Sequence, residues 1–191
     1  AITLQSAAGM TCSGRAGVCY KPPSGQGFED MESEVVKLLG MDGTTLRKVA
    51  DSFGYQWLVL EDADIEALVT QVHMVNSSLA DAGWGPQLLC SVFGLCRLED
   101  PSSSGGEGSA GAGTEGGEGG GEPTVGPGRV RPSSSFLVYL FKRGTFYPFV
   151  PTGSEKRDTE EELRLRSLVA DDLKVEADLA RWFPLWDLPV G

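Results

Sequence analysis

Four cysteines and one histidine are the residues of this chain best suited to bind a metal ion or to act as nucleophiles. The thiols are those of Cys12, Cys19, Cys90 and Cys96. Zinc sites bring their ligands in closely spaced pairs, but the chain has no C-x-x-C pair and His73 stands alone in a helical pattern. The spacing therefore predicts no metal site. We expect reduced thiols, with two disulfides as the alternative in an oxidising compartment.

Four polar residues could line a ligand cleft: His73, Asn76, Gln87 and Tyr147. His73 and Asn76 are three residues apart and border the apolar stripe of a predicted helix. One interpretation places this pair inside a cleft, and the other makes it a hydrogen-bonded pair that secures the helix to a sheet. Because no nucleophile motif lies nearby, a His-based catalytic site has little support, and we predict no catalytic residues.

Two further patterns resemble functional motifs only in part. Gly105, Gly106 and Gly108 lie in a Gly-rich stretch, but the G-x-x-x-x-G-K-[ST] motif and its strand-to-helix context are absent. The acidic run 160–162 stands at the start of a predicted helix, where it favours the helix dipole and usually forms a solvated face. We therefore predict no phosphate loop, no paired-carboxylate site and no cofactor.

The composition limits the class of protein. The chain has 191 residues and a formal net charge of −11, which disfavours nucleic-acid binding because phosphate recognition depends on clustered Lys and Arg. No apolar run approaches the roughly 20 residues of a membrane-spanning helix, and the first residues do not form a signal peptide. Since the sequence begins with Ala1, we expect it to start inside a longer chain. We expect a cytoplasmic protein.

The elements that must position these residues follow from apolar spacing. They are a strand at 15–20, a helix at 28–39, a hairpin at 45–51 and 55–61, a helix at 64–82, a strand at 87–97 and a helix at 159–173. The helix at 64–82 has the clearest stripe, formed by Ile65, Leu68, Val69, Val72, Val75 and Leu79. Asp64 can cap its start and Gly83 can close it, and Gly94 could form a bulge in the strand that follows.

The densest apolar run, 136–150, predicts a hairpin at the centre of the fold. Large residues lie on both faces of its first strand, Gly144 suits the turn, and Pro148 places the second strand at a sheet edge. The predicted fold is α+β, with a single antiparallel sheet and helices packed mainly on one face.

The stretch at about 100–134 consists mainly of Gly, Ser, Glu and Pro. Such a composition cannot offset the entropy cost of folding. We predict a disordered insertion that interrupts one domain spanning residues 1–191, since a longer loop costs only slowly more entropy.

The C-terminal tail and the central turn are the predicted partner-binding regions. Trp182, Phe183 and Trp186 could seal one sheet face or remain partly open as a docking surface. Lys142 and Arg143 form a cationic pair that could meet an acidic partner helix. The alternative for this pair is a turn that only adds solubility.

Five ordered motifs resemble the PspAB-type proteins, associates of phage shock protein A (PspA). They are Gly54–Trp57, His73–Asn76, Gly83–Ser91, Tyr139–Phe149 and Arg181–Trp186. The resemblance extends over nearly the whole chain, except the Gly-rich insertion, and brings no catalytic residues. The order of elements is also similar to the YbjN and type III secretion chaperone group.

What the PspAB resemblance implies is an accessory role in an envelope-stress system, beside a PspA-like protein and an HtpX-type membrane protease. It also implies attachment to the inner face of the cell membrane through such partners. Our first hypothesis is therefore a non-enzymatic adaptor. The alternative is a small-ligand-binding or enzymatic domain with a cleft near His73.

Overall fold

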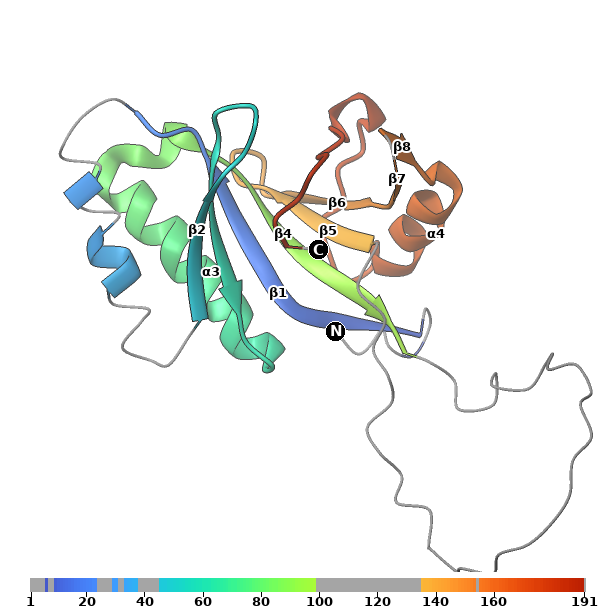
Figure 1. Cartoon of the computed structure of the whole chain (residues 1–191). Coiled ribbons are helices and arrows are strands. Elements are labelled where there is room, and N and C mark those ends of the chain that lie inside the picture. Colours follow the sequence, from blue (N-terminus) through green and yellow to red (C-terminus); the bar gives the residue numbers. More distant parts are fainter. Residues whose placement is uncertain are drawn as a thin grey trace, which may run out of the picture.

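The computed structural model describes residues 6, 9–23, 29–30, 33–37, 45–98, 135–153 and 155–190. Its main element is a six-stranded antiparallel sheet in the order β2-β3-β1-β4-β5-β6 (Figure 1). The strands are β1 (Met10–Tyr20), β2 (Thr45–Ala50), β3 (Gln56–Glu61), β4 (Leu88–Arg97), β5 (Ser135–Leu140) and β6 (Thr145–Phe149). The short strands β7 (Pro151–Gly153) and β8 (Lys156–Arg157) form a separate pair.

The two longer described helices are α3 (Ile65–Leu79) and α4 (Thr159–Val169), shown in green and orange in Figure 1. Short helical turns follow at Ala80–Trp84, Gly85–Gln87 and Leu179–Arg181. Of the helix predicted at 28–39, residues 29–30 and 33–37 are helical and the others lie outside the described residues. The predicted insertion at about 100–134 also lies outside them.

The sheet separates two apolar layers because alternate residues of its strands point to opposite sides. Leu58 and Leu60 of β3 pack with α3 on one side, which we call the helix face. Trp57 and Val59 pack with the C-terminal segment 175–190 on the other side, which we call the tail face. Leu165 of α4 belongs to a third cluster with residues of β1 and β4 on the helix face. The predicted α+β class, with one main antiparallel sheet and helices on one face, is confirmed.

Helix α3 forms where its stripe and cap predict it. The Asp64 carboxylate accepts a hydrogen bond from the Glu66 N–H at 2.9 Å, which satisfies one of the free donors at a helix start. Leu68, Val72, Val75 and Leu79 are buried on the sheet. Val69 does not join them, since its side chain is 48% exposed and lines an apolar groove beside α3.

Several predicted boundaries were wrong. The first strand begins at Met10 rather than Arg15. Helix α3 ends at Leu79 and continues as a π-helical turn in which Gly83 has a φ of 87°, a conformation that glycine adopts without strain and that ends a helix. Helix α4 ends at Val169, so the predicted end at 173 was four residues too late.

Gly94 serves a different purpose from the predicted bulge. The β4–β5 register runs through Gly94 without interruption, whereas the extra residues opposite Gly94 lie in β1 between Cys12 and Ala16. A second register shift, between Cys19 and Tyr20, places the extra residue Leu89 in β4. A Cβ atom at position 94 would clash with Ser13 Oγ. Gly94 therefore makes room for the bulge of its neighbour.

The central hairpin is confirmed as β5 and β6, with Gly144 at a φ of 63° in the turn. Strand β6 ends the six-stranded sheet, as Pro148 predicted. The C-terminal segment pairs with the backbone of this edge where Phe146 and Val175 form an isolated parallel bridge. This bridge starts the path of the tail across the tail face.

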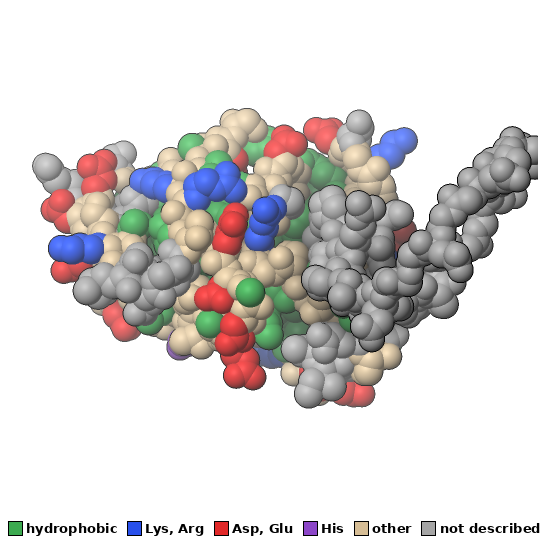
Figure 2. Space-filling model, turned by 60° about the horizontal axis from the view of Figure 1, so that its bottom comes forward, with side chains coloured by type: hydrophobic (Ala, Val, Ile, Leu, Met, Phe, Trp, Pro, Cys, Tyr) green, Lys and Arg blue, Asp and Glu red, His purple; other side chains and the backbone are tan. Residues whose placement is uncertain are grey.

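Charges are mixed on the surface that Figure 2 shows. Red acidic and blue basic side chains lie next to one another there, with green hydrophobic side chains between them. No helix within the described residues has the length and apolar character needed to cross a bilayer.

Candidate partner-binding site

An apolar groove of about 520 Å³ lies on the tail face between the β2–β3 hairpin and the C-terminal segment. We call it the tail groove. Its floor is formed by Cys19, Trp57, Cys90 and Tyr147, one wall by Phe53 and Tyr55, and the other wall by residues 183–186. Two of the predicted partner-binding residues, Phe183 and Trp186, line it.

Buried donors hold the irregular tail in place. The Trp182 indole is 5% exposed, stacks on Tyr147 with ring centroids 5.9 Å apart, and donates to the Glu176 carbonyl at 3.0 Å. Arg157 Nη1 donates to the Trp182 carbonyl at 2.7 Å, and the Tyr147 hydroxyl donates to the Phe183 carbonyl at 2.8 Å. The Trp182 indole bond lies within the tail, whereas Arg157 and Tyr147 reach the tail carbonyls from other elements and so fix its backbone to them. Burial raises the pKa of the Tyr147 phenol, which keeps it a donor.

The three tail aromatics have three different environments. Trp182 is part of the core, Trp186 is half-buried with its ring 5.5 Å from that of Phe149 in an edge-to-face contact, and Phe183 is 55% exposed. Across the tail groove, Phe53 is 65% exposed. The tail therefore seals the sheet through Trp182 and also leaves the Phe183 side chain open on a fixed backbone, while its use as a docking surface stays a prediction.

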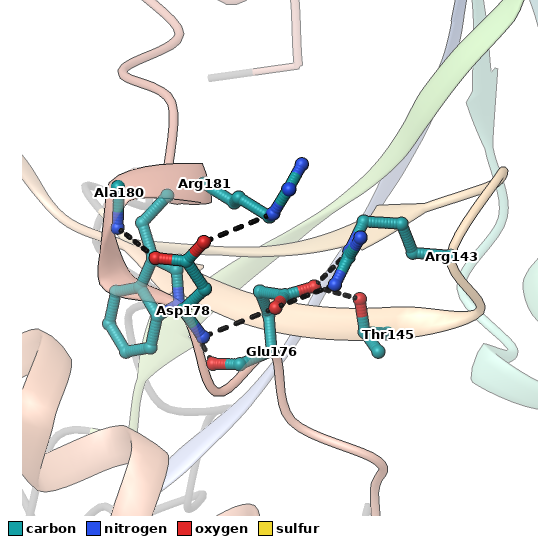
Figure 3. A network of polar contacts seen from close by, with 7 residues as sticks. Arg143, Thr145, Glu176, Asp178, Ala180 and Arg181 are labelled. Atoms are coloured by element: carbon teal, nitrogen blue, oxygen red, sulfur yellow. Dashed lines mark hydrogen bonds and ion pairs between the residues drawn. The ribbon is translucent and has the colours of Figure 1, made fainter.

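The two basic residues of the central turn have different environments. Lys142 is exposed. The Arg143 guanidinium forms an ion pair with the Glu176 carboxylate, with Nη2 at 3.2 Å from Oε1 and Nε bonded to Oε2. Figure 3 shows Arg143 and Thr145 directed toward Glu176. Arg143 is thus paired within the chain while its side chain stays 43% exposed, and its role toward a partner stays a prediction.

Glu176 links the start of the tail to β6. The residue is 2% exposed, and its carboxylate accepts hydrogen bonds from Thr145 Oγ1 at 2.8 Å and from the Asp178 N–H at 3.2 Å. The hydrogen bonds from Arg143 lower the Glu176 pKa to about 2, although burial opposes this change. The carboxylate is therefore ionised at neutral pH, and the sequence contained no local signal for this contact.

One family of proteins matches nearly the whole chain: PspA associated protein B, over residues 1–110 and 123–190. The chain belongs to this family. The resemblance based on the five motifs is therefore confirmed, and the unmatched residues 111–122 fall within the Gly-rich stretch. No curated protein and no solved structure matches the chain, so the likeness to YbjN and the secretion chaperones stays a prediction. The PspAB family name links the chain to PspA and to the phage-shock response.

In this PspAB protein the four residues of the predicted ligand cleft are not assembled around one cavity. His73 is exposed on α3, with Nε2 3.4 Å from Ser77 Oγ. Asn76 is buried and donates to Ser91 Oγ of β4 at 2.9 Å. Asn76, and not a pair of His73 and Asn76, therefore forms the hydrogen bond between the helix and the sheet. Gln87 is half-buried before β4, and Tyr147 lies on the tail face.

The cysteines of this PspAB protein are thiols without a disulfide. Cys19 and Cys90 face each other across β1 and β4 at the floor of the tail groove. A hydrogen bond with Cys90 and burial raise the pKa of Cys19, and burial raises the pKa of Cys12 and Cys96. Such thiols are weak nucleophiles because the thiolate is the reactive form. Within the described ranges, no three His, Cys, Asp or Glu side chains gather to hold a metal ion.

Proposed function

We propose that this PspAB-family protein is a non-enzymatic adaptor that holds a segment of a PspA-like protein in the tail groove during the phage-shock response. The family membership supports the partner. The observation that carries the site is Phe183, whose side chain is 55% exposed although its carbonyl is bound by Tyr147. Aromatic side chains that are held rigidly beside an apolar pocket are typical of interface hot spots.

The lining of the tail groove favours an apolar partner segment. Among its described lining residues the one carboxylate, that of Asp51, already accepts hydrogen bonds from the backbone N–H groups of Phe53 and Tyr55, both at 2.9 Å, and from Trp57 Nε1 at 3.1 Å. The groove therefore offers mainly apolar contacts. Lys142 follows the lining residue Leu140 closely in sequence, and it would meet an acidic side chain at the border of the bound segment.

The test is titration of the purified chain with the purified PspA-like protein of the same cell, followed by calorimetry. We expect Phe183→Ala to weaken binding at least tenfold and Lys142→Glu to weaken it less, with a reduced salt dependence. Leu179→Ala is the matched control, since Leu179 is 50% exposed in the same tail but outside the groove. Equal binding by wild type and Phe183→Ala would remove the groove from the proposal, and no binding by wild type would remove the partner.

The HtpX-type membrane protease is the second partner of the proposed adaptor, and it would bring the chain to the inner face of the cell membrane. The support for this part is the PspAB membership. Co-purification of the tagged chain from detergent-solubilised membranes of its own cell tests it. Recovery of the protease with wild type is the expected result, and its absence while the PspA-like protein is recovered would contradict this part alone.

A further inference from the structure

We propose that Cys19 and Cys90 form a modification site, at which hydrogen peroxide converts the two thiols into a reversible disulfide. Cys19 lies in β1 and Cys90 in β4, and the two residues are direct partners in the antiparallel register. Both residues line the floor of the tail groove. The disulfide does not depend on the proposed function, whereas its coupling to a bound partner rests on that function.

The backbone already holds the two residues at a separation that a disulfide accepts. Opposite residues of an antiparallel pair have Cα atoms about 4.5 or 5.5 Å apart, and disulfides span Cα separations of about 4.4–6.8 Å. Both side chains belong to the same cluster on the tail face, and a hydrogen bond joins the two thiols. Formation of the bond therefore needs side-chain rotation and little movement of the strands.

The other two cysteines of the same strands lack this geometry. Cys12 pairs with Leu95 and Cys96 pairs with Thr11, so these two thiols are one residue out of register. Such an offset directs side chains to opposite faces of a sheet. Cys96 Sγ instead donates to the carbonyls of Thr11 and Cys12, at 3.6 and 3.7 Å. These two thiols therefore provide an internal comparison for the proposed site.

The environment of the pair sets the order of two chemical steps. The hydrogen bond with Cys90 and burial raise the pKa of Cys19, so Cys19 keeps its proton and the attack on peroxide falls to Cys90. The Cys90 sulfur bonds to one peroxide oxygen, the O–O bond breaks, and the other oxygen leaves with the thiol proton as water. The Cys19 sulfur then bonds to the sulfur of this sulfenic acid, the S–O bond breaks, and a second water leaves. Each sulfur gives up one electron, and the peroxide accepts both.

Peroxide can reach the pair through the tail groove. Cys19 is 3% exposed and Cys90 is 5% exposed, and both are part of the floor of this groove of about 520 Å³. A peroxide molecule is not much larger than water, which needs about 30 Å³. A partner segment in the groove would cover both sulfurs. We therefore expect oxidation of the free chain and protection of the bound chain.

The test treats the purified chain with hydrogen peroxide and maps its peptides by mass spectrometry without reduction. We expect one cross-linked peptide pair that contains Cys19 and Cys90, and dithiothreitol should restore both thiols. Cys19→Ser should leave a sulfenic acid on Cys90 that dimedone traps, whereas Cys90→Ser should leave none on Cys19. Cys12→Ser and Cys96→Ser are the matched controls, and both should form the cross-link as wild type does. Oxidised wild type should also unfold at a higher urea concentration, because the cross-link restricts the unfolded chain.

Each contrary result has a definite meaning. Four free thiols after peroxide treatment of the folded chain, as in the untreated chain, or a cross-link through Cys12 or Cys96 would overturn the proposal. Sulfinic acid on Cys90 of wild type would also overturn it, because a neighbouring thiol should capture the sulfenic acid first.

The coupling to a partner has a separate measurement. A saturating amount of the PspA-like protein should slow disulfide formation at least tenfold, and equal rates with and without the complex would overturn the coupling. If calorimetry shows no complex, the proposed function and the coupling fail together, while the disulfide of the free chain stands.

Discussion

The two faces of the sheet are covered by segments that satisfy their backbone hydrogen bonds in different ways. Helix α3 satisfies its own backbone hydrogen bonds, so an apolar stripe attaches it to the helix face together with side-chain bonds from Asn76 to Ser91 and from Gln71 to Asp62. The irregular tail has no internal ladder, and its attachment depends on side-chain donors, including Arg157 and Tyr147, that reach its carbonyls. An irregular cover is thus held at specific points, and between those points it can present a side chain such as Phe183 to solvent.

Removal of the main anchor of the tail should have the largest effect. Trp182→Ala deletes a buried indole and its hydrogen bond to the Glu176 carbonyl, and we expect the free energy of unfolding to fall by about 3–5 kcal/mol. Urea denaturation measures this change. Leu179→Ala, at an exposed position of the same tail, should change it by less than about 0.5 kcal/mol. Similar effects of the two variants would mean that the tail is not attached mainly at specific residues such as Trp182.

The second anchor of the tail predicts a specific dependence on acid. The Glu176 pKa is 4.5 without its contacts and about 2 in the folded chain, so the folded state binds this proton more weakly than the unfolded chain does. Its stabilisation is therefore complete above pH 4.5 and is lost as the pH falls toward 2. Glu176→Gln should flatten the stability profile in that window. Glu160→Gln, at an exposed position, should leave the profile as in wild type.

On the helix face, the bond between Asn76 and Ser91 is the corresponding polar contact. Asn76→Ala leaves the buried Ser91 hydroxyl without this partner, and we expect a loss of about 1–3 kcal/mol in unfolding free energy. A double-mutant cycle with Ser91→Ala isolates the bond. Strictly additive losses would show that the bond between Asn76 and Ser91 does not contribute to the attachment of α3. The helix would then differ still more from the tail, which side-chain hydrogen bonds hold in place.

The smallest expected change is at Tyr147. Tyr147→Phe keeps the ring stacked on Trp182 but removes the bond to the Phe183 carbonyl, so stability should fall by about 1 kcal/mol. Hydrogen exchange should become faster at the backbone amides that follow Phe183 and stay constant in α3. Unchanged exchange in the tail would indicate that Trp182 holds it without help from the hydroxyl.

Local signals in the sequence predicted the elements well. The stripe and cap of α3 and the glycine turn of β5–β6 are patterns within a few residues, and they fix the type of each element. Spacing does not say how far a neighbour extends, however. Val69 was therefore assigned to the apolar stripe although its side chain is 48% exposed, and Leu173 was assigned to α4 although it follows the end of that helix.

The candidate site was predictable only in part. The apolar tail was visible as a run of aromatics, and Phe183 and Trp186 line the tail groove. The contacts of Arg143 with Glu176 and of Tyr147 with Phe183 join residues 33 and 36 positions apart. Such pairs depend on the path of the tail over the sheet, which leaves no periodic trace. Phe53 had one weak signal, a large apolar residue in a polar turn.

The bridge between Phe146 and Val175 also affects how copies of this chain meet in a crowded cell. It occupies hydrogen-bonding groups at the β6 margin, and Pro148 removes another donor from the same strand. The opposite margin, β2, carries the exposed charges of Arg47 and Lys48. Because the β6 margin is partly occupied and the β2 margin carries like charges, edge-to-edge pairing of strands between two copies of this chain is discouraged.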